Sequence, residues 1–423
     1  MSIATSADYY PHNEASLPPY LNNIPGIANL LGGKPADWRI QEVGDGNLNL
    51  VFIVRGPSNG IVVKQALPYV RLVGESWPLP LSRAHFEQRA LREQAQHAPG
   101  LVPEIYHYDE ALALIAMELL EPHIIMRKGM IQGIEYPQFA EHITDFMARS
   151  LFFSSDLALS AAEKKARMAV FCGNTALCKI TEDLVFTEPY MLAENNRWTS
   201  PQLDADAQAI RTDSALKVGV SELKLKFLTS AQALIHGDLH TGSIMLTQTD
   251  TRVIDPEFAF YGPIGFDPGA CIANLLLNYF SQDGHATAQD PRTDYQEWIL
   301  QQVEAVWTGF DAKFRALWRE QHQGDAYPQA LFVDDAQAQA LAQDRYMQNV
   351  FADALGFAGA KMIRRILGLA HNIDLEWIED PEQRAQCERR GLRVGRELIL
   401  NRAAIGSIAA VSALARDLRA ELA

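Results

Sequence analysis

The stretch that decides the fold is HGDLHTGSIM at residues 236–245, followed closely by VIDPE at residues 253–257. An apolar strand leads into a carboxylate in a tight loop, a second short strand follows, and two carboxylates then stand two residues apart. This order would bring Asp238, Asp255 and Glu257 toward one place. Such a set suits a substrate hydroxyl together with Mg²⁺, and phosphoryl transfer to an alcohol needs both.

These motifs resemble the aminoglycoside phosphotransferase and choline kinase superfamily, relatives of the protein kinases whose catalytic loop reads HGDLHxxN. The HGDLHTGSI form followed by DPE resembles the 5-methylthioribose kinase family in particular. The resemblance implies that Asp238 orients a substrate hydroxyl and accepts its proton, and that Asp255 and Glu257 bind Mg²⁺ between the ATP phosphates. One departure is Ser243, which stands where the superfamily has an Asn metal ligand, and Glu257 is the candidate to supply the missing ligand.

An isolated Asp-x-Glu is commonly a solvated strand end, but its place next to HGDLH favours a site. In the superfamily a carboxylate equivalent to Asp267 braces the catalytic loop, so a structural role is expected for it. We expect His236 to pack and to hydrogen-bond within the loop. His240 is expected to face the site without binding a metal, because no second ligand stands at metal spacing.

Upstream, VGDGNLN at residues 43–49 lies at the turn of a predicted hairpin, where glycines let backbone amides approach phosphates closely. Gly44, Gly46 and Asn47 are therefore candidate nucleotide contacts. As a bare GxG pattern this loop is weak evidence.

Lys64 follows within a predicted strand, where a buried charge without a partner is unfavourable in free energy. Its amine would reach the α and β phosphates of a nucleotide, and the order of loop and then lysine matches the kinase pattern. By resemblance its partner is Glu87 on the following helix, with Glu93 as the second candidate. A surface ion pair is the plain alternative for Lys64 and Glu87.

The strand at residues 112–117 runs into ELLEP, which resembles the hinge between kinase lobes, so Glu118 and Leu120 are candidate backbone contacts of adenine. The adjacent Arg364 and Arg365 resemble paired arginines near the sugar in the family, and guanidinium groups suit hydroxyls and developing phosphate charge. Trp198, in a loop at residues 195–203, could close over the substrate. The alternatives are solvated arginines on a helix and a simple helix-capping loop.

The surrounding pattern predicts an α+β protein with two lobes, and the resemblance implies that these lobes form a protein-kinase-like fold. Residues 1–121 form an antiparallel-sheet nucleotide-clamping lobe, with a hairpin at 38–67, a helix at 82–97 capped by Ser82, and strands within 101–121. Residues 122–423 form a mainly helical lobe that carries the catalytic loop and the substrate pocket. Its expected helices span 139–155, 158–180, 205–230, 294–320 and 383–421, and its strands fall within 234–262.

Composition limits the partners of the 423-residue chain. The net charge of -15 argues against broad binding to nucleic acid or an anionic membrane, because such surfaces require Lys and Arg. The four cysteines are too few and too scattered for a disulfide framework. We find no signal peptide and no apolar stretch of about 18 residues, so a cytoplasmic protein is expected.

The resemblance implies ATP-dependent phosphorylation of 5-methylthioribose at its anomeric hydroxyl, a step of methionine salvage, with ATP and Mg²⁺ as cofactors and a homodimer as the assembly. Related kinases acting on choline, ethanolamine, homoserine or an aminoglycoside share HGD and a downstream aspartate. A cationic substrate would call for an acidic or aromatic pocket rather than Arg364 and Arg365. A third possibility is a pseudokinase that binds nucleotide without turnover, to which the loss of Asn at position 243 would point.

Overall fold

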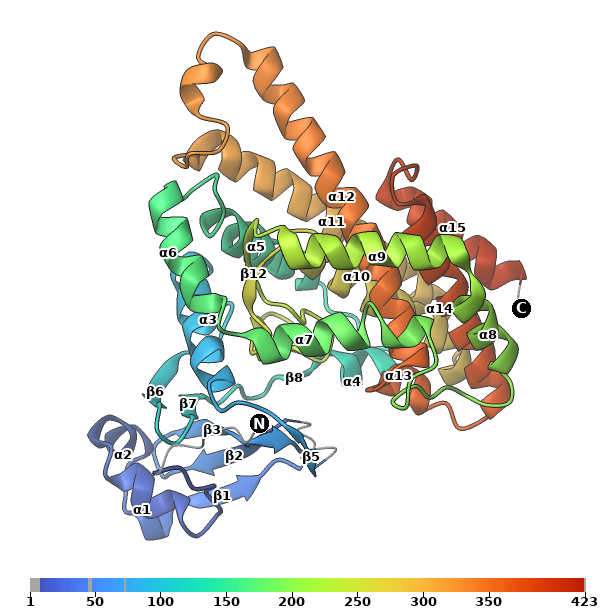
Figure 1. Cartoon of the computed structure of the whole chain (residues 1–423). Coiled ribbons are helices and arrows are strands. Elements are labelled where there is room, and N and C mark those ends of the chain that lie inside the picture. Colours follow the sequence, from blue (N-terminus) through green and yellow to red (C-terminus); the bar gives the residue numbers. More distant parts are fainter. Residues whose placement is uncertain (1–7, 45–47, 72–73, 422–423) are drawn as a thin grey trace.

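The computed structural model describes residues 8–44, 48–71 and 74–421. A small sheet-rich lobe at the bottom of Figure 1 carries a much larger helical lobe above it. The chain passes between them after β7, which ends at Glu118, and the next strand, β8 (Ile124–Ile125), already pairs within the helical lobe. The two-lobed, protein-kinase-like α+β architecture predicted from the sequence is confirmed.

The sheet of the small lobe is antiparallel and has the order β1-β2-β3-β7-β6. Its strands are β1 (Arg39–Glu42), β2 (Asn49–Arg55), β3 (Gly60–Ala66), β6 (Ile105–Asp109) and β7 (Leu114–Glu118). A separate ribbon joins β4 (Tyr69–Val70) to β5 (Gly74–Pro78). The alternation of β3 buries Ile61 and Val63 against β2 and the helices α1 (Leu17–Asn22) and α2 (Pro25–Leu31). Lys64 therefore projects from the opposite face of the sheet.

Helix α3 (Arg83–His97) packs against β3, β6 and β7. The predicted helix is confirmed, but the expected cap is wrong, because Ser82 has a helical conformation and makes no side-chain capping bond. Sequence reasoning also missed α1 and α2, which are short and begin at or next to prolines.

Three long helices predicted in the large lobe are each two helices in the structure. The first splits at Asn174, whose amide donates to the backbone carbonyls of Glu257 and Ala259. The second splits at Asp213, which caps the following helix by accepting a hydrogen bond from the Leu216 amide. The pieces are α6 (Ala161–Phe171), α7 (Thr175–Leu184), α8 (Asp204–Thr212), α9 (Ser214–Thr229), α14 (Pro381–Asn401) and α15 (Ile408–Glu421).

The predicted helix ranges did not include α12 (Ala336–Leu367), which is 32 residues long, although Arg364 and Arg365 were placed on a helix. Its second half is buried almost continuously from Asp353 to Leu367, so it lacks the one-sided apolar period by which a helix is found in a sequence. It packs between α10 (Phe266–His285) and α14. The other helices are α4 (Met126–Ile131), α5 (Phe139–Phe153), α11 (Thr293–Gln321) and α13 (Ile373–Glu376), with single 3-10 turns at Pro35–Asp37, Glu188–Tyr190 and Gln329–Leu331.

The catalytic segment forms two small antiparallel sheets on the large lobe. In one, β10 (Ile244–Leu246) pairs with β8 and with β11 (Thr251–Val253). In the other, β9 (Ala233–Ile235) pairs with β12 (Phe260–Gly262). The loops between these strands hold residues 236–243 and 254–259, so both sequence motifs lie between anchored strand ends.

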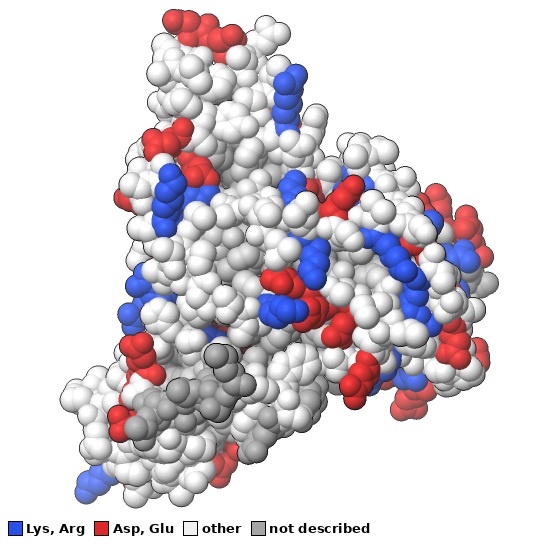
Figure 2. Space-filling view, in the orientation of Figure 1, with Lys and Arg blue, Asp and Glu red and all other residues white. Residues whose placement is uncertain are grey.

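Two further features of the described residues are the distribution of charge on the surface and the character of the long helices. On the face shown in Figure 2, acidic and basic side chains of the described residues are interspersed over most of the surface. In the described part of the chain, no helix combines the length and apolar character that a membrane crossing requires.

Candidate active site

Asp238 lies in a loop whose backbone is fixed by buried groups. Gly237 has a φ of +84°, and a Cβ there would lie 2.3 Å from the Phe258 carbonyl oxygen, so only glycine fits. Asp267 accepts hydrogen bonds from the backbone amides of His236 and Gly237 at 2.6 and 3.0 Å. The structure thus gives Asp267 the bracing position that the resemblance implied.

The two histidines of the loop bond within the site. His236 donates from Nε2 to the Ile254 carbonyl at 2.9 Å, which ties the Asp238 loop to the Asp255 loop. His240 approaches Asp238 at 3.1 Å through Nε2, while its Nδ1 accepts from the Gly242 amide at 2.9 Å. Burial lowers the pKa of His240 to about 3, so its ring is neutral.

Three basic groups surround the Asp238 carboxylate. Lys361 Nζ lies 2.7 Å from Oδ1, and Arg365 Nη2 lies 3.7 Å from Oδ2, the oxygen that faces His240. Burial by itself would raise the pKa of this carboxyl, but Lys361 and His240 outweigh burial and hold the pKa well below its usual value. Asp238 is therefore ionised at neutral pH and can accept a hydrogen bond from a hydroxyl.

Lys64 bridges the small lobe and the catalytic segment. Its Nζ donates to Glu87 Oε1 at 2.8 Å and also forms an ion pair with Asp255. Burial works against its charge, but Asp255 and Glu87 outweigh it, so the pKa of Lys64 is raised. Glu93 lies elsewhere and pairs with Arg167, which leaves Glu87 as the partner.

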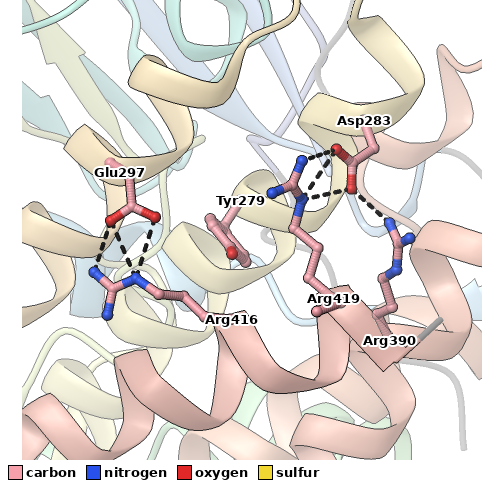
Figure 3. A pocket seen from close by; sticks show the side chains of 7 residues that line it. Tyr279, Asp283, Glu297, Arg390, Arg416 and Arg419 are labelled. Carbon is pink, nitrogen blue, oxygen red and sulfur yellow. Dashed lines mark hydrogen bonds and ion pairs between the residues drawn. The ribbon is translucent and has the colours of Figure 1, made fainter. Parts of the chain in front are cut away.

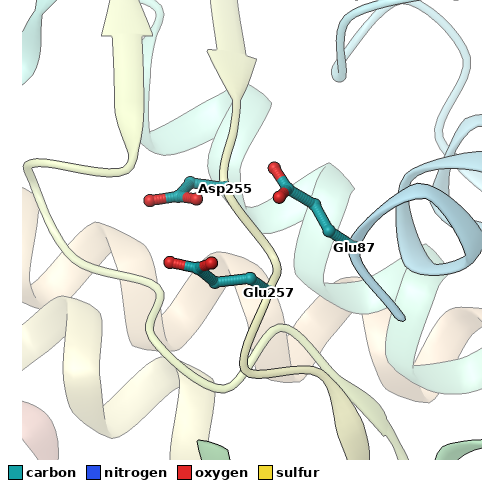
Figure 4. Close-up of side chains that lie close together, drawn as sticks. All are labelled: Glu87, Asp255 and Glu257. Atoms are coloured by element: carbon teal, nitrogen blue, oxygen red, sulfur yellow. The ribbon is translucent and has the colours of Figure 1, made fainter. Parts of the chain in front are cut away.

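Glu87, Asp255 and Glu257 bring carboxylate oxygens within 4.8 Å of one another, as Figure 4 shows. Glu87 comes from α3, while the other two follow β11. Asp255 has a φ of +69° and a side chain that is 45% exposed, whereas the side chain of Glu257 is only 3% exposed. Hard oxygen donors from one helix and one loop, with the Asp255 carboxylate partly exposed to solvent, fit a divalent cation such as Mg²⁺.

Glu257 is held by two residues that sequence reasoning missed. Asn49 donates from Nδ2 to Glu257 Oε2 at 3.0 Å, and Arg83 Nε lies 3.6 Å from the same oxygen. Arg83 is fully buried and also donates to the Leu48 carbonyl and to Asn49 Oδ1 at 2.8 and 3.0 Å. The base of the glycine loop is thereby joined to the carboxylate cluster.

Arg364 and Arg365 are both buried at the C-terminal end of α12. Each donates from Nη1 to the carbonyl of Ala370 at 2.9 Å, and Ala370 has a φ of +57°. They are not solvated side chains, and Arg365 is the one that approaches Asp238. Arg127, also missed, pairs with the buried Asp374 at 3.1 Å.

Several predicted contacts lie at the margin of this cluster. Trp198 donates to Asp204 Oδ1 at 2.7 Å and lies 5.0 Å from the Arg211 guanidinium, so its described contacts turn toward α8. Ser243 is buried and donates to the Asp238 carbonyl at 3.0 Å, which is a structural contact rather than a metal ligand's position. The substrate role of Trp198 stays a prediction.

The nucleotide contacts are placed only in part. The Glu118 amide donates to the Glu104 carbonyl at 2.8 Å, and its carboxylate accepts from Arg252 at 3.1 Å. Leu120 is buried, and the space where Gly44 would carry a Cβ is open. Gly46 and Asn47 lie outside the described residues. The adenine and phosphate contacts therefore stay predictions.

Little in the sequence could have found the missed residues. Lys361 precedes the singled-out Arg364 by one helical turn, which was a usable signal, since residues three apart share a helix face. Arg83, Asn49 and Arg127 reach the site from other elements, and spacing along the chain does not relate them to it.

Comparison with known proteins agrees with this geometry. The model of the phosphotransferase enzyme family matches residues 39–306. Methylthioribose kinase 1 from Oryza sativa subsp. japonica is 50% identical, covering 95% of this chain and 94% of its own length. Methylthioribose kinase from Escherichia coli O45:K1 is 48% identical, covering 95% and 96% respectively. A solved choline/ethanolamine kinase family protein from Mesorhizobium loti has 15% identity and a TM-score of 0.42, covering 93% of this chain and 97% of its own, so the assignment rests on the sequence relatives. The chain belongs to the phosphotransferase enzyme family and, within it, to the methylthioribose kinases.

Proposed function

We propose that this enzyme transfers the γ-phosphoryl group of ATP to the anomeric hydroxyl of 5-methylthioribose, giving 5-methylthioribose 1-phosphate and ADP. The hydroxyl oxygen forms a bond to the γ-phosphorus while the bond from that phosphorus to the bridging oxygen of ADP breaks. The electron pair of the broken bond stays on ADP, and the proton of the hydroxyl passes to Asp238.

The observation that carries this substrate class is the buried positive charge around Asp238. Lys361, Arg364, Arg365 and Arg127 all lie near this carboxylate, while the acid Asp374 pairs with Arg127 and Asp267 lies close to Lys361. Such a pocket repels choline, ethanolamine and aminoglycosides, which are cations, and suits a neutral, hydroxyl-rich sugar whose product carries a phosphate. The cationic alternatives are therefore disfavoured, and homoserine is tested directly below.

The small lobe supplies the nucleotide side of the reaction. In the structure Lys64 pairs with Asp255, and we infer that it turns toward the α and β phosphates when ATP enters, while Glu87 keeps it in place. Asp255 and Glu257 would hold Mg²⁺, which supplies charge neutralisation on the phosphate oxygens. Glu118 and Leu120 would contact adenine through their backbone, and Gly44, Gly46 and Asn47 would cover the phosphates.

Further proposals concern the location of the enzyme, its assembly, its pathway and the boundary between its lobes. We propose a cytoplasmic homodimer in methionine salvage, with the lobes dividing at residue 121 and Trp198 closing over the sugar. These statements are supported by the family resemblance, and the division of lobes also by the passage of the chain between β7 and β8.

A coupled ADP-release assay tests the proposal with ATP, Mg²⁺ and one acceptor at a time: methylthioribose, choline, homoserine or an aminoglycoside. We expect turnover confined to methylthioribose. Asp238→Asn should lower kcat by about 10²–10⁴-fold while ATP affinity stays within a factor of about two, because only the acceptor's base is removed. Turnover on another acceptor would reject the substrate, and no turnover on any acceptor would favour a nucleotide-binding pseudokinase.

A further inference from the structure

Lys361 is a buried cation that the reaction scheme above leaves unused. It lies on α12, its side chain is 3% exposed, and its Nζ sits 4.8 Å from the centre of the Phe266 ring. A buried ammonium group is costly unless it is paired. The pairing partner is Asp238, whose Oδ1 lies 2.7 Å away although the two residues are 123 positions apart in the chain.

The Asp238 carboxylate is anchored once at each oxygen. Lys361 donates to Oδ1, and His240 approaches Oδ2 with Nε2. Because His240 Nδ1 accepts from the Gly242 amide, the ring proton belongs on Nε2 and points to Asp238. A carboxylate offers about four lone-pair positions, so each anchored oxygen still has one position for a substrate hydroxyl.

We propose that Lys361 is a positioning residue which acts through Asp238: it fixes the rotamer of the carboxylate and keeps it ionised while the acceptor hydroxyl binds. Lys361 does not take the proton of the hydroxyl, because its charged ammonium group already carries three protons and has no lone pair to accept another. This assignment rests on the proposed role of Asp238 in phosphoryl transfer.

Other charged and titratable groups face this pair. Their charges decide how far the pKa of Asp238 changes when the charge of Lys361 is removed. They are His236 and His240 from the loop itself, Arg127 from α4, Asp267 from α10, Arg364 and Arg365 from α12, and Asp374 from α13. Burial pushes the pKa of Asp238 up, and Lys361 is the strongest group that opposes burial. Without the charge of Lys361, the pKa of Asp238 should therefore rise even though Arg365 remains 3.7 Å away.

The test compares Lys361→Met, Lys361→Arg and the matched control Lys226→Met. Lys226 of α9 also pairs with an aspartate on α12, Asp353, at 2.5 Å, but this pair takes no part in the Asp238 cluster. We expect Lys361→Met to lower kcat about 10–100-fold and to leave the KM for ATP within about twofold of the wild-type value. The acid limb of its pH–rate profile should move upward by at least about one pH unit. Lys361→Arg should restore the acid limb, and Lys226→Met should match the wild-type enzyme.

A second readout does not depend on the acceptor. With aspartate labelled by ¹³C at its carboxyl carbon, the Asp238 resonance is identified by its loss in Asp238→Asn and titrated by NMR. We expect Asp238 to stay ionised down to the lowest pH at which the wild type remains folded, whereas in Lys361→Met its titration should move to higher pH. This separates the two proposals, since failure on methylthioribose leaves the NMR comparison intact.

An unchanged Asp238 titration in folded Lys361→Met would overturn the assignment, as would an unchanged kcat and acid limb. If Lys361→Met does not fold, Lys361→Gln takes its place, because it keeps a hydrogen-bond donor and removes only the charge. An unchanged Asp238 titration in the Lys361→Gln variant would also overturn the assignment.

Discussion

At the scale of single residues, Lys64 shows how a charge is kept inside a sheet lobe. It projects from β3 toward α3, where Glu87 is buried, and it reaches Asp255 across the two lobes. We expect Lys64→Met to raise the KM for ATP and to lower kcat by about 10²-fold or more, since the amine that would spread phosphate charge is gone. Steady-state kinetics with varied ATP check this.

The matched control is Lys179→Met, because Lys179 pairs with Asp183 one turn away on the exposed surface of α7. Its removal should leave both constants within about twofold. Equal behaviour of the two variants would contradict the assignment of Lys64 to the nucleotide.

Gly237 is a second residue to test, because the backbone conformation at its position requires glycine. Its positive φ and the Phe258 carbonyl exclude a side chain, so Gly237→Ala should lower the free energy of unfolding by roughly 3 kcal/mol and disturb the loop of Asp238. Urea unfolding followed by circular dichroism measures it. Gly26→Ala is the control, because a Cβ there would meet no atom within 4 Å and the φ of Gly26 is not positive. That variant should stay within about 1 kcal/mol of the wild type, and equal losses in both variants would contradict the steric argument.

At the scale of elements, α14 carries a buried carboxyl against the loop that holds Trp198. Burial raises the pKa of Glu388 to about 7, with a hydrogen bond from Thr199 opposing it. Because the folded-state pKa lies above the usual 4.5, the contribution of Glu388 to stability should be most favourable below pH 4.5 and should fall as the pH rises through about 7. Glu388→Gln should then be more stable than the wild type by roughly 2 kcal/mol at pH 8 and equal to it at pH 4.5.

Thermal or urea unfolding at the two pH values measures the difference. Glu382→Gln, exposed in the first turn of the same helix, should show no such dependence. The same difference at both pH values would refute the ionisation of Glu388 as its cause.

At the scale of the whole molecule, the C-terminal helix is joined to the core of the large lobe by ion pairs. Asp283 of α10 accepts from Arg419 of α15 at 2.8 Å and from Arg390 of α14 at 2.5 Å, around a cavity of about 330 Å³ (Figure 3). Arg390 has only 4% of its side chain exposed, so its charge needs a partner. Asp283→Asn should lower the free energy of unfolding by about 2 kcal/mol, between the values for exposed and buried pairs, without changing KM.

Glu297→Gln provides the comparison within the same cavity. Glu297 pairs with Arg416 of α15 at 2.7 Å, but both side chains are more than 40% exposed. Its loss should cost about 0.5 kcal/mol in urea unfolding. Equal losses of unfolding free energy in the two variants would show that the burial of Arg390 does not strengthen its ion pair with Asp283.

The sequence by itself determined the class of the fold, the order of its parts and the two carboxylate motifs. These features are local: strand period, turn residues and contiguous motifs depend on neighbours within a few positions. For the same reason Lys64, Asp238, Asp255 and Glu257 could be named, since each stands in or next to such a pattern, whereas Glu87 was named from the family resemblance.

Only the tertiary structure decided which distant side chains complete the site. Lys361 reaches Asp238 from α12, whose buried second half carries no amphipathic period, and Arg83 and Asn49 reach Glu257 from the small lobe. Helix ends at Asn174 and Asp213 were likewise set by hydrogen bonds that spacing does not reveal. Such contacts follow from packing between elements far apart in the chain, and a buried charge finds its partner only when those elements meet.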